Sequence, residues 1–282
     1  MTAPENDRPT PRWISKHSSP SIDLHQRKPW DLITSADQTE SLQAIGEQAA
    51  QSLEVAVAGA DFPLGRFTLP DESPVYLPLH YEPNYAYPLV VWLSDSEWTS
   101  RELLDLMPRI SPQNYVGLSI EGLTATNRFA RGPMSLAESL DPLESLLETL
   151  KDIACQMRRE YHVHSERIFL AGFGEQASVA LQMLIRRPEW FAGVLGFGLR
   201  KTKLESVHKN YDDLRGKRVF LSAGIRDSHV NLTELTSLGR LLRSTGMQPV
   251  LRSYDSGEEP SPKLLRDVDH WLMNCVFEST LV

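Results

Sequence analysis

Apolar runs and amphipathic segments alternate along the chain from about residue 88 to the C-terminal end. The apolar runs are short and continuous, which is typical of strands buried on both faces. They cover residues 87–93, 115–120, 167–173, 191–197, 218–223 and 250–254. Two weaker runs that prolines punctuate, at residues 67–69 and 75–79, are typical of edge strands.

The segments between these strands carry apolar residues three or four positions apart, which is the spacing of one helix face. Thr99, Asp141 and Asn231 precede three of these segments and have the side chains of good N-cap residues. The pattern predicts helices that begin near residues 99, 141, 174, 231 and 262, and a weaker helix over residues 38–53.

Strands that alternate with helices form a parallel sheet joined by right-handed crossovers. The predicted fold class is therefore α/β, with a doubly wound, mostly parallel sheet and helices on both faces, in one domain over residues 37–282. Only residues 198–217 separate the strand at 191–197 from the next strand, so we expect no large lid. Ligand sites in such folds lie at the carboxyl ends of the strands.

Residues 1–36 are rich in proline, serine and charged residues and show neither helical nor strand periodicity. They predict a flexible or extended N-terminal arm. Trp13 and Trp30 are unusual in such a segment, and we interpret them as anchors on the domain or on a second subunit. The loop at residues 127–131 joins arginines to a phenylalanine, as interfaces often do, or is simply a solvated loop. A homo-oligomer is compatible with both features.

The chain has 282 residues and a net charge of −8, without the basic block that nucleic-acid binding needs. No run approaches the roughly 18 apolar residues of a membrane helix. The first residues lack the basic and apolar regions of a secretory signal. We therefore expect a cytoplasmic protein that binds neither nucleic acid nor membrane. Cys155 and Cys275 lie on apolar faces of predicted helices, as buried free thiols do.

One apolar run ends in Gly172-Phe173-Gly174-Glu175-Gln176, and a helical pattern follows at once. Strand, sharp turn and helix form the context of the nucleophile elbow G-x-S-x-G. On this segment the chain resembles the α/β-hydrolase family, and within it the small carboxylesterase/phospholipase or dienelactone-hydrolase-like branch. The resemblance extends over residues 75–278 and rests further on residues 88–93, 191–194, 220–227 and 254–257. In this chain Gly174 replaces the serine, and the bulkier Gln176 replaces the closing glycine.

The resemblance implies a serine, an acid and a histidine in that chain order, with backbone N–H groups that hold the oxyanion. Here the serine position is Gly174, the acid position is Asp227 and the histidine position is Glu258. The charge of Glu258 would repel Asp227. The oxyanion segment usually reads His-Gly, whereas this chain has Ser94-Asp95, which brings a carboxylate to the place where negative charge would develop.

These substitutions predict an esterase-like fold without catalysis, a pseudoenzyme that binds an unknown protein or small molecule in the former active-site cleft. The alternative is a serine esterase with a rearranged triad. Ser94 lies at a strand end, and His229 follows Asp227 by two residues, so these three could form one such triad. Ser178 is the other candidate nucleophile, but one turn into the helix it should face away from the elbow.

Acidic residues gather at the predicted carboxyl edge of the sheet: Asp95, Glu175, Asp227 and Glu258. Two carboxylates about 4 Å apart repel by roughly 4 kcal/mol at an effective dielectric constant of 20. We hypothesise that this cleft, with Ser94 at its rim, holds a small cation such as Ca²⁺ or Mg²⁺ or docks a partner's lysine or arginine. The alternative is that the carboxylates spread into water. No histidine pair shows metal-ligand spacing such as H-E-x-x-H, and no cofactor is predicted.

Overall fold

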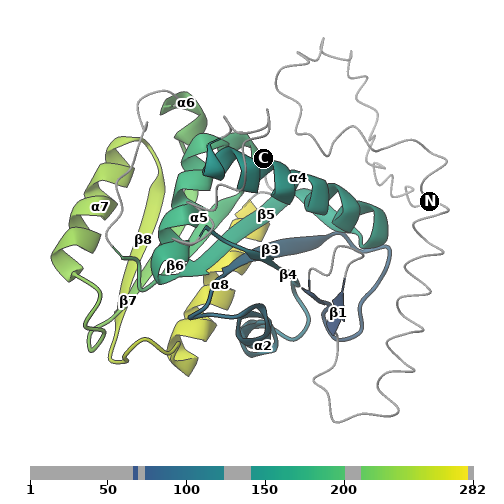
Figure 1. Cartoon of the computed structure of the whole chain (residues 1–282), viewed down its shortest axis with the longest axis horizontal. Helices are drawn as coiled ribbons and strands as arrows, with labels where there is room; N and C mark the ends of the chain where they lie inside the picture. Colours follow the sequence, from purple (N-terminus) through teal and green to yellow (C-terminus); the bar gives the residue numbers. More distant parts are fainter. Residues whose placement is uncertain (1–65, 69–73, 124–140, 201–210, 279–282) are drawn as a thin grey trace, which may run out of the picture.

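The computed structural model of the chain describes residues 66–68, 74–123, 141–200 and 211–278 (Figure 1). These residues form one domain around an eight-stranded sheet with the strand order β1-β2-β4-β3-β5-β6-β7-β8. The predicted N-terminal arm, the weak helix at 38–53 and the loop at 127–131 lie outside the described residues. The boundary between arm and domain therefore stays a prediction.

Six of the strands pair in parallel and follow the predicted apolar runs. They are β3 (Tyr87–Ser94), β4 (Val116–Glu121), β5 (Val163–Phe173), β6 (Gly193–Phe197), β7 (Arg218–Gly224) and β8 (Gln248–Tyr254). β1 (Arg66–Thr68) and β2 (Pro74–Tyr76) are antiparallel, and β2 joins β1 to β4. Among the described strands β1 is one edge of the sheet and β8 is the other, whereas β2, also predicted as an edge strand, pairs on both sides.

Helices connect the parallel strands. They are α2 (Ser100–Ile110), α4 (Pro142–Glu160), α5 (Gly174–Arg186), the 3₁₀ turn η3 (Pro188–Trp190), α6 (Tyr211–Leu214), α7 (Leu232–Ser244) and α8 (Pro262–Glu278). The predicted N-caps are confirmed, because the side chains of Thr99, Asp141 and Asn231 each accept a hydrogen bond from a backbone N–H of the first turn. None of the described helices combines the length and the apolar character needed to cross a bilayer.

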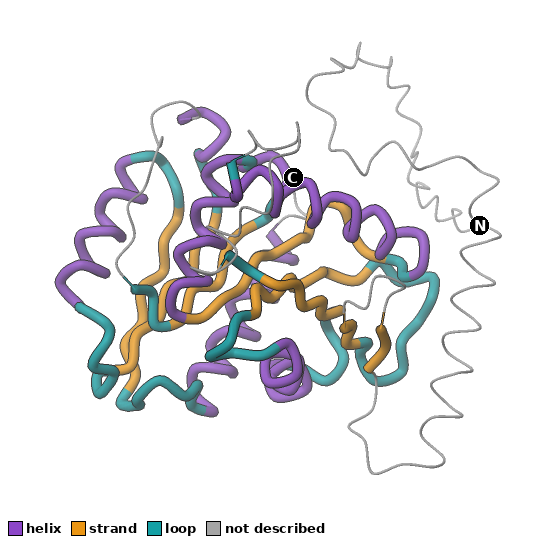
Figure 2. The backbone as a smooth tube through the Cα atoms, viewed as in Figure 1, coloured by secondary structure: helices purple, strands orange, loops and turns teal. Residues whose placement is uncertain are grey.

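Strand β3 shows why the sheet is covered on both faces. Leu89, Val91 and Leu93 pack into one hydrophobic cluster with α4, α5 and α7, while Val90 and Trp92 pack into a second cluster with α2 and α8. Successive side chains of a strand point to opposite faces, so a continuous apolar run buries both. Figure 2 shows the helices on both sides of the sheet. The predicted doubly wound α/β fold is confirmed.

The carboxyl ends of the parallel strands meet at one edge of the sheet and position the candidate site. The strand order reverses at β3, because β4 pairs on one side of it and β5 on the other. At such a switch point the loops diverge and open a crevice. The site residues considered below lie at the carboxyl ends of β3 to β8, in the loops that follow these strands or in the first turns of α5.

Candidate functional site

The predicted elbow between β5 and α5 is present. Phe173 ends the strand in an extended conformation, and Gly174 begins the helix with φ of +52°. Glycine adopts this left-handed region without the steric cost that a side chain brings. A Cβ on Gly172 would lie 2.6 Å from the backbone carbon of Gln176, so a glycine is also needed where the strand passes the first helical turn.

The bulky Gln176 fits into this elbow because a glycine stands opposite it. Its side chain is buried, and its Nε2 donates to Asp95 Oδ2 (3.2 Å) and to the carbonyl of Leu123 (3.0 Å). Gly122 provides the space, since a Cβ at that position would overlap the Gln176 amide. The amide oxygen of Gln176 has no hydrogen-bond partner among the described residues. Gln176 therefore links the loops after β3 and β4 without displacing the elbow.

The place above Gly174, where a nucleophile would stand, faces the side chain of Arg200. A Cβ on Gly174 would lie 3.3 Å from Arg200 Nε. The guanidinium forms a two-pronged ion pair with Glu97, with donor–acceptor distances of 3.1 Å and 2.8 Å. The hydrogen bonds that the guanidinium donates to Glu97 raise the pKa of Arg200, partial burial opposes this, and the charges of Glu97, Glu175 and Glu258 raise the pKa further. The chain thus supplies one arginine to the acidic side chains at this edge of the sheet.

Sequence reasoning missed Arg200 and Glu97. Each lies on a loop after a strand, β6 for Arg200 and β3 for Glu97, and 103 positions separate them in the sequence. Their placement after strand ends was the available signal, since parallel strands bring such loops to one edge.

The two candidate serines are bonded to backbone groups. Ser94 Oγ donates to the carbonyl of Ile120 (3.1 Å) and lies 3.1 Å from Ser100 Oγ. Ser178 Oγ donates to the carbonyl of Arg200 (3.0 Å). Both serines are 6% exposed. The structure therefore ties both hydroxyls to carbonyl oxygens, and neither forms a hydrogen bond with a histidine of the described residues.

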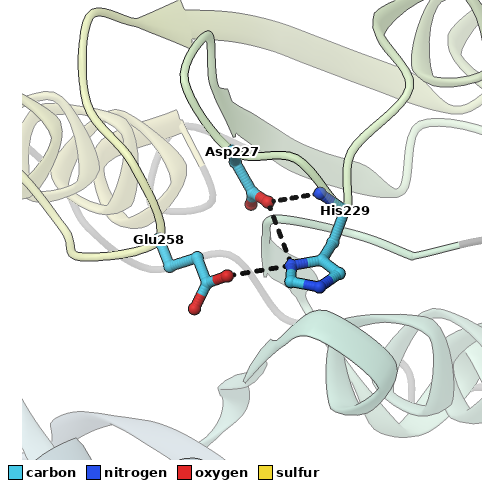
Figure 3. Close-up of side chains that lie close together, drawn as sticks. All are labelled: Asp227, His229 and Glu258. Atoms are coloured by element: carbon cyan, nitrogen blue, oxygen red, sulfur yellow. Dashed lines mark hydrogen bonds and ion pairs between the residues drawn. The ribbon is translucent and has the colours of Figure 1, made fainter.

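Asp227, His229 and Glu258 do come together (Figure 3). Asp227 Oδ1 accepts the backbone N–H of His229 at 2.8 Å. The Nδ1 atom of His229 lies 2.8 Å from Glu258 Oε1 and 3.6 Å from Asp227 Oδ1. Both carboxylates, which were expected from the sequence to repel each other, approach the same Nδ1 atom of the imidazole. In Figure 3 the Nε2 atom points away from both.

This group permits two kinds of chemistry. A carboxylate that holds Nδ1–H leaves Nε2 as a proton acceptor, which is the arrangement of an oriented general base. The same three side chains could also hold a metal ion, because one ligand atom from each lies within 4.8 Å of the others. The three side chains differ in burial. The Asp227 side chain is 6% exposed, whereas those of His229 and Glu258 are 55% and 57% exposed.

The remaining predicted cleft residues, Asp95 and Glu175, lie at the same edge. Asp95 Oδ1 accepts the backbone N–H groups of Glu97 and Trp98, each at 2.9 Å. Asp95 therefore stabilises the turn after β3, and the same turn lets Trp98 stack on Phe173, with ring centroids 4.0 Å apart. Glu175 lies in the first turn of α5, where a negative side chain suits the helix dipole.

Comparison with known proteins defines the fold. Neither protein-family models nor curated proteins match the chain. Among solved structures, one of two fungal esterases of Rhizomucor miehei superposes with a TM-score of 0.55 at 14% identity, over 90% of this chain and 93% of that one. A carboxylesterase of Mesorhizobium loti superposes with a TM-score of 0.53 at 19% identity, over 74% and 99% of the two chains. A sugar hydrolase of Lactococcus lactis gives a TM-score of 0.52 at 15% identity, over 76% and 98%. The chain has the α/β-hydrolase fold.

Proposed function

We propose that this chain is a binding protein built on an esterase-like α/β-hydrolase fold, without serine-esterase catalysis. The observation that carries the proposal is the environment of the elbow. Gly174 has no hydroxyl, and the guanidinium of Arg200 lies across the space that a nucleophile would occupy, fixed there by Glu97.

The other positions that catalysis would need support the same conclusion. The histidine position holds Glu258, and the segment that would donate to an oxyanion carries the Asp95 carboxylate, which accepts three hydrogen bonds. In a serine protease the loss of the nucleophile or of the base alone lowers kcat by about 10⁶. With both positions substituted, this elbow offers neither the nucleophile nor the base that is needed to form an acyl-enzyme.

The charge of the cleft indicates what it would bind. Among the described residues, five carboxylates at this edge lie with one arginine and one histidine, namely Asp95, Glu97, Glu175, Asp227 and Glu258 with Arg200 and His229, while Arg226 and Asp255 pair with each other there. A cleft with excess negative charge attracts positive groups and disfavours anions. We propose that the ligand, a small molecule or a segment of a partner protein, presents a positively charged group.

Esterase activity and active-site labelling test the loss of catalysis. The full chain would be assayed with short-chain p-nitrophenyl esters and with a fluorophosphonate probe, beside Ser94→Ala and Ser178→Ala. Ser237→Ala is the matched control, because Ser237 is exposed on α7 and bonded only to its own helix. We expect no labelling and no rate above a heat-denatured blank in any of them. The proposal is overturned if the probe labels the chain and if Ser94→Ala or Ser178→Ala abolishes this labelling while Ser237→Ala does not.

The oriented imidazole of His229 favours a second candidate, a serine esterase with a rearranged triad. Its base would be His229 with Asp227 and Glu258 as orienting acids, and Ser94 would be its nucleophile. Ser94 would first have to leave the carbonyl of Ile120. Labelling that disappears in both Ser94→Ala and His229→Ala would establish this candidate in place of the first.

A further inference from the structure

The Asp227 carboxylate is buried, and its one charged partner among the described residues is the His229 imidazole, which carries a charge only when protonated. Its side chain is 6% exposed, and no lysine or arginine of the described residues pairs with it. Its contacts are the backbone N–H and the Nδ1 atom of His229. Burying an ionised carboxylate is costly, and such groups are normally paired with a cation or coordinate a metal.

Space is kept free beside this carboxylate. Gly198, at the end of β6, has φ of +56°, and a Cβ there would lie 3.2 Å from Asp227 Oδ2. Any larger residue would be strained by this backbone conformation and would also crowd the carboxylate. Asp227 therefore sits against bare backbone on one side and faces His229 and Glu258 on the other.

The spacing of the donor atoms suits a small divalent cation. His229 Nδ1 is 2.8 Å from Glu258 Oε1 and 3.6 Å from Asp227 Oδ1. A tetrahedral zinc ion with bonds of about 2.0–2.1 Å has neighbouring donors about 3.3 Å apart, which lies between these two distances. The three donor atoms all lie within 4.8 Å of one another, and the side chains of His229 and Glu258 are more than half exposed, so they have room to close around an ion.

We propose that Asp227, His229 and Glu258 form a binding site for a divalent transition-metal cation, Zn²⁺ or Mn²⁺, at the mouth of the cleft. Two carboxylates balance the ion's charge, and one imidazole favours a transition metal over Ca²⁺, which takes six to eight oxygen ligands. Three protein ligands leave at least one coordination position open to water or to a ligand. Bound metal would join the loop after β7 to the loop after β8.

The site does not depend on the loss of ester hydrolysis, because metal binding and esterase activity are measured separately. Metal binding with no activity would satisfy both proposals. Esterase activity without metal binding would overturn both proposals. Each measurement taken alone decides only the proposal that it tests.

Calorimetric titration of the full, untagged chain with Zn²⁺ and with Mn²⁺ tests the site. We expect the wild type to bind one equivalent of metal. His229→Ala and Glu258→Gln should each weaken this binding by about 100-fold or more, because even indirect supports of metal ligands contribute about 10- to 100-fold in affinity. The order of affinity should be Zn²⁺ above Mn²⁺. The metal should raise the melting temperature of the wild type and leave that of Glu258→Gln unchanged.

Two matched controls separate this site from background binding. His270 is an exposed histidine on α8, and Glu259 is an exposed neighbour of Glu258. His270→Ala and Glu259→Gln should bind metal as the wild type does. Mn²⁺ binds poorly to thiols, so its titration excludes a contribution of the two free cysteines. No heat at millimolar metal, or equal binding by the wild type and Glu258→Gln, would overturn the proposal.

Discussion

The packing of Gln176 against Gly122 predicts a measurable coupling between two positions that are distant in sequence. A Cβ at Gly122 would overlap the buried amide of Gln176, and the backbone of Gly122 is not in the left-handed region, so strain is not the issue. We expect Gly122→Ala to lower the free energy of unfolding by about 1–3 kcal/mol, the usual cost of overpacking.

Removing the obstructing side chain should rescue this loss. Gln176→Ala by itself gives up the hydrogen bonds to Asp95 and Leu123 and should lower stability by about 1–3 kcal/mol. In that background the amide no longer obstructs the added methyl group, whose remaining close neighbour is Leu93 Cβ at 3.3 Å. The double variant should therefore be more stable than the sum of the single effects by about 1–3 kcal/mol, the range typical of residues in contact.

Urea unfolding followed by tryptophan fluorescence would measure this cycle. Gly257→Ala is the matched control, because nothing lies within 4 Å of a Cβ at Gly257. Its effect should stay within about 0.5 kcal/mol. If Gly122→Ala is as harmless as Gly257→Ala, or if its cost is the same with Ala as with Gln at position 176, the packing argument is refuted.

Three further predictions concern the elbow, a buried tyrosine and a helix cap. Gly174→Ser should lower stability by about 1–2 kcal/mol because of the positive φ and the contact with Arg200, and Arg200→Ala in the same background should recover part of it in thermal unfolding. Burial raises the pKa of Tyr76 to about 12 from its usual 10. Because the folded protein favours the protonated phenol, the contribution of Tyr76 to stability is complete below pH 10 and is lost as the pH rises towards 12. Tyr76→Phe should therefore flatten this decline in stability, as followed by urea titrations. Asn231→Ala should cost about 1 kcal/mol, because the first turn of α7 loses two side-chain hydrogen bonds; an unchanged unfolding midpoint would contradict the cap's role.

The secondary structure and the class of fold follow from the sequence because their causes are local. The apolar run at residues 87–93 is buried on both faces, and a strand with helices on both sides is the arrangement that allows this. Thr99 and Asn231 cap helices through atoms two or three residues away. The elbow was also predictable, since it depends on Gly172 and Gly174 at the junction of one strand and one helix.

The content of the site depended on the tertiary structure. Arg200 lies over Gly174, and Gly122 opposes Gln176, because the strand order places their loops side by side. From the sequence, Glu258 and Asp227 were expected to repel each other, whereas in the structure both carboxylates approach the Nδ1 atom of His229. Hydrophobic periodicity and helix capping depend on residues that are a few positions apart, so both can be recognised in the sequence. Contacts between side chains on separate loops exist only once the sheet has fixed where each strand ends, and that geometry is a property of the whole fold.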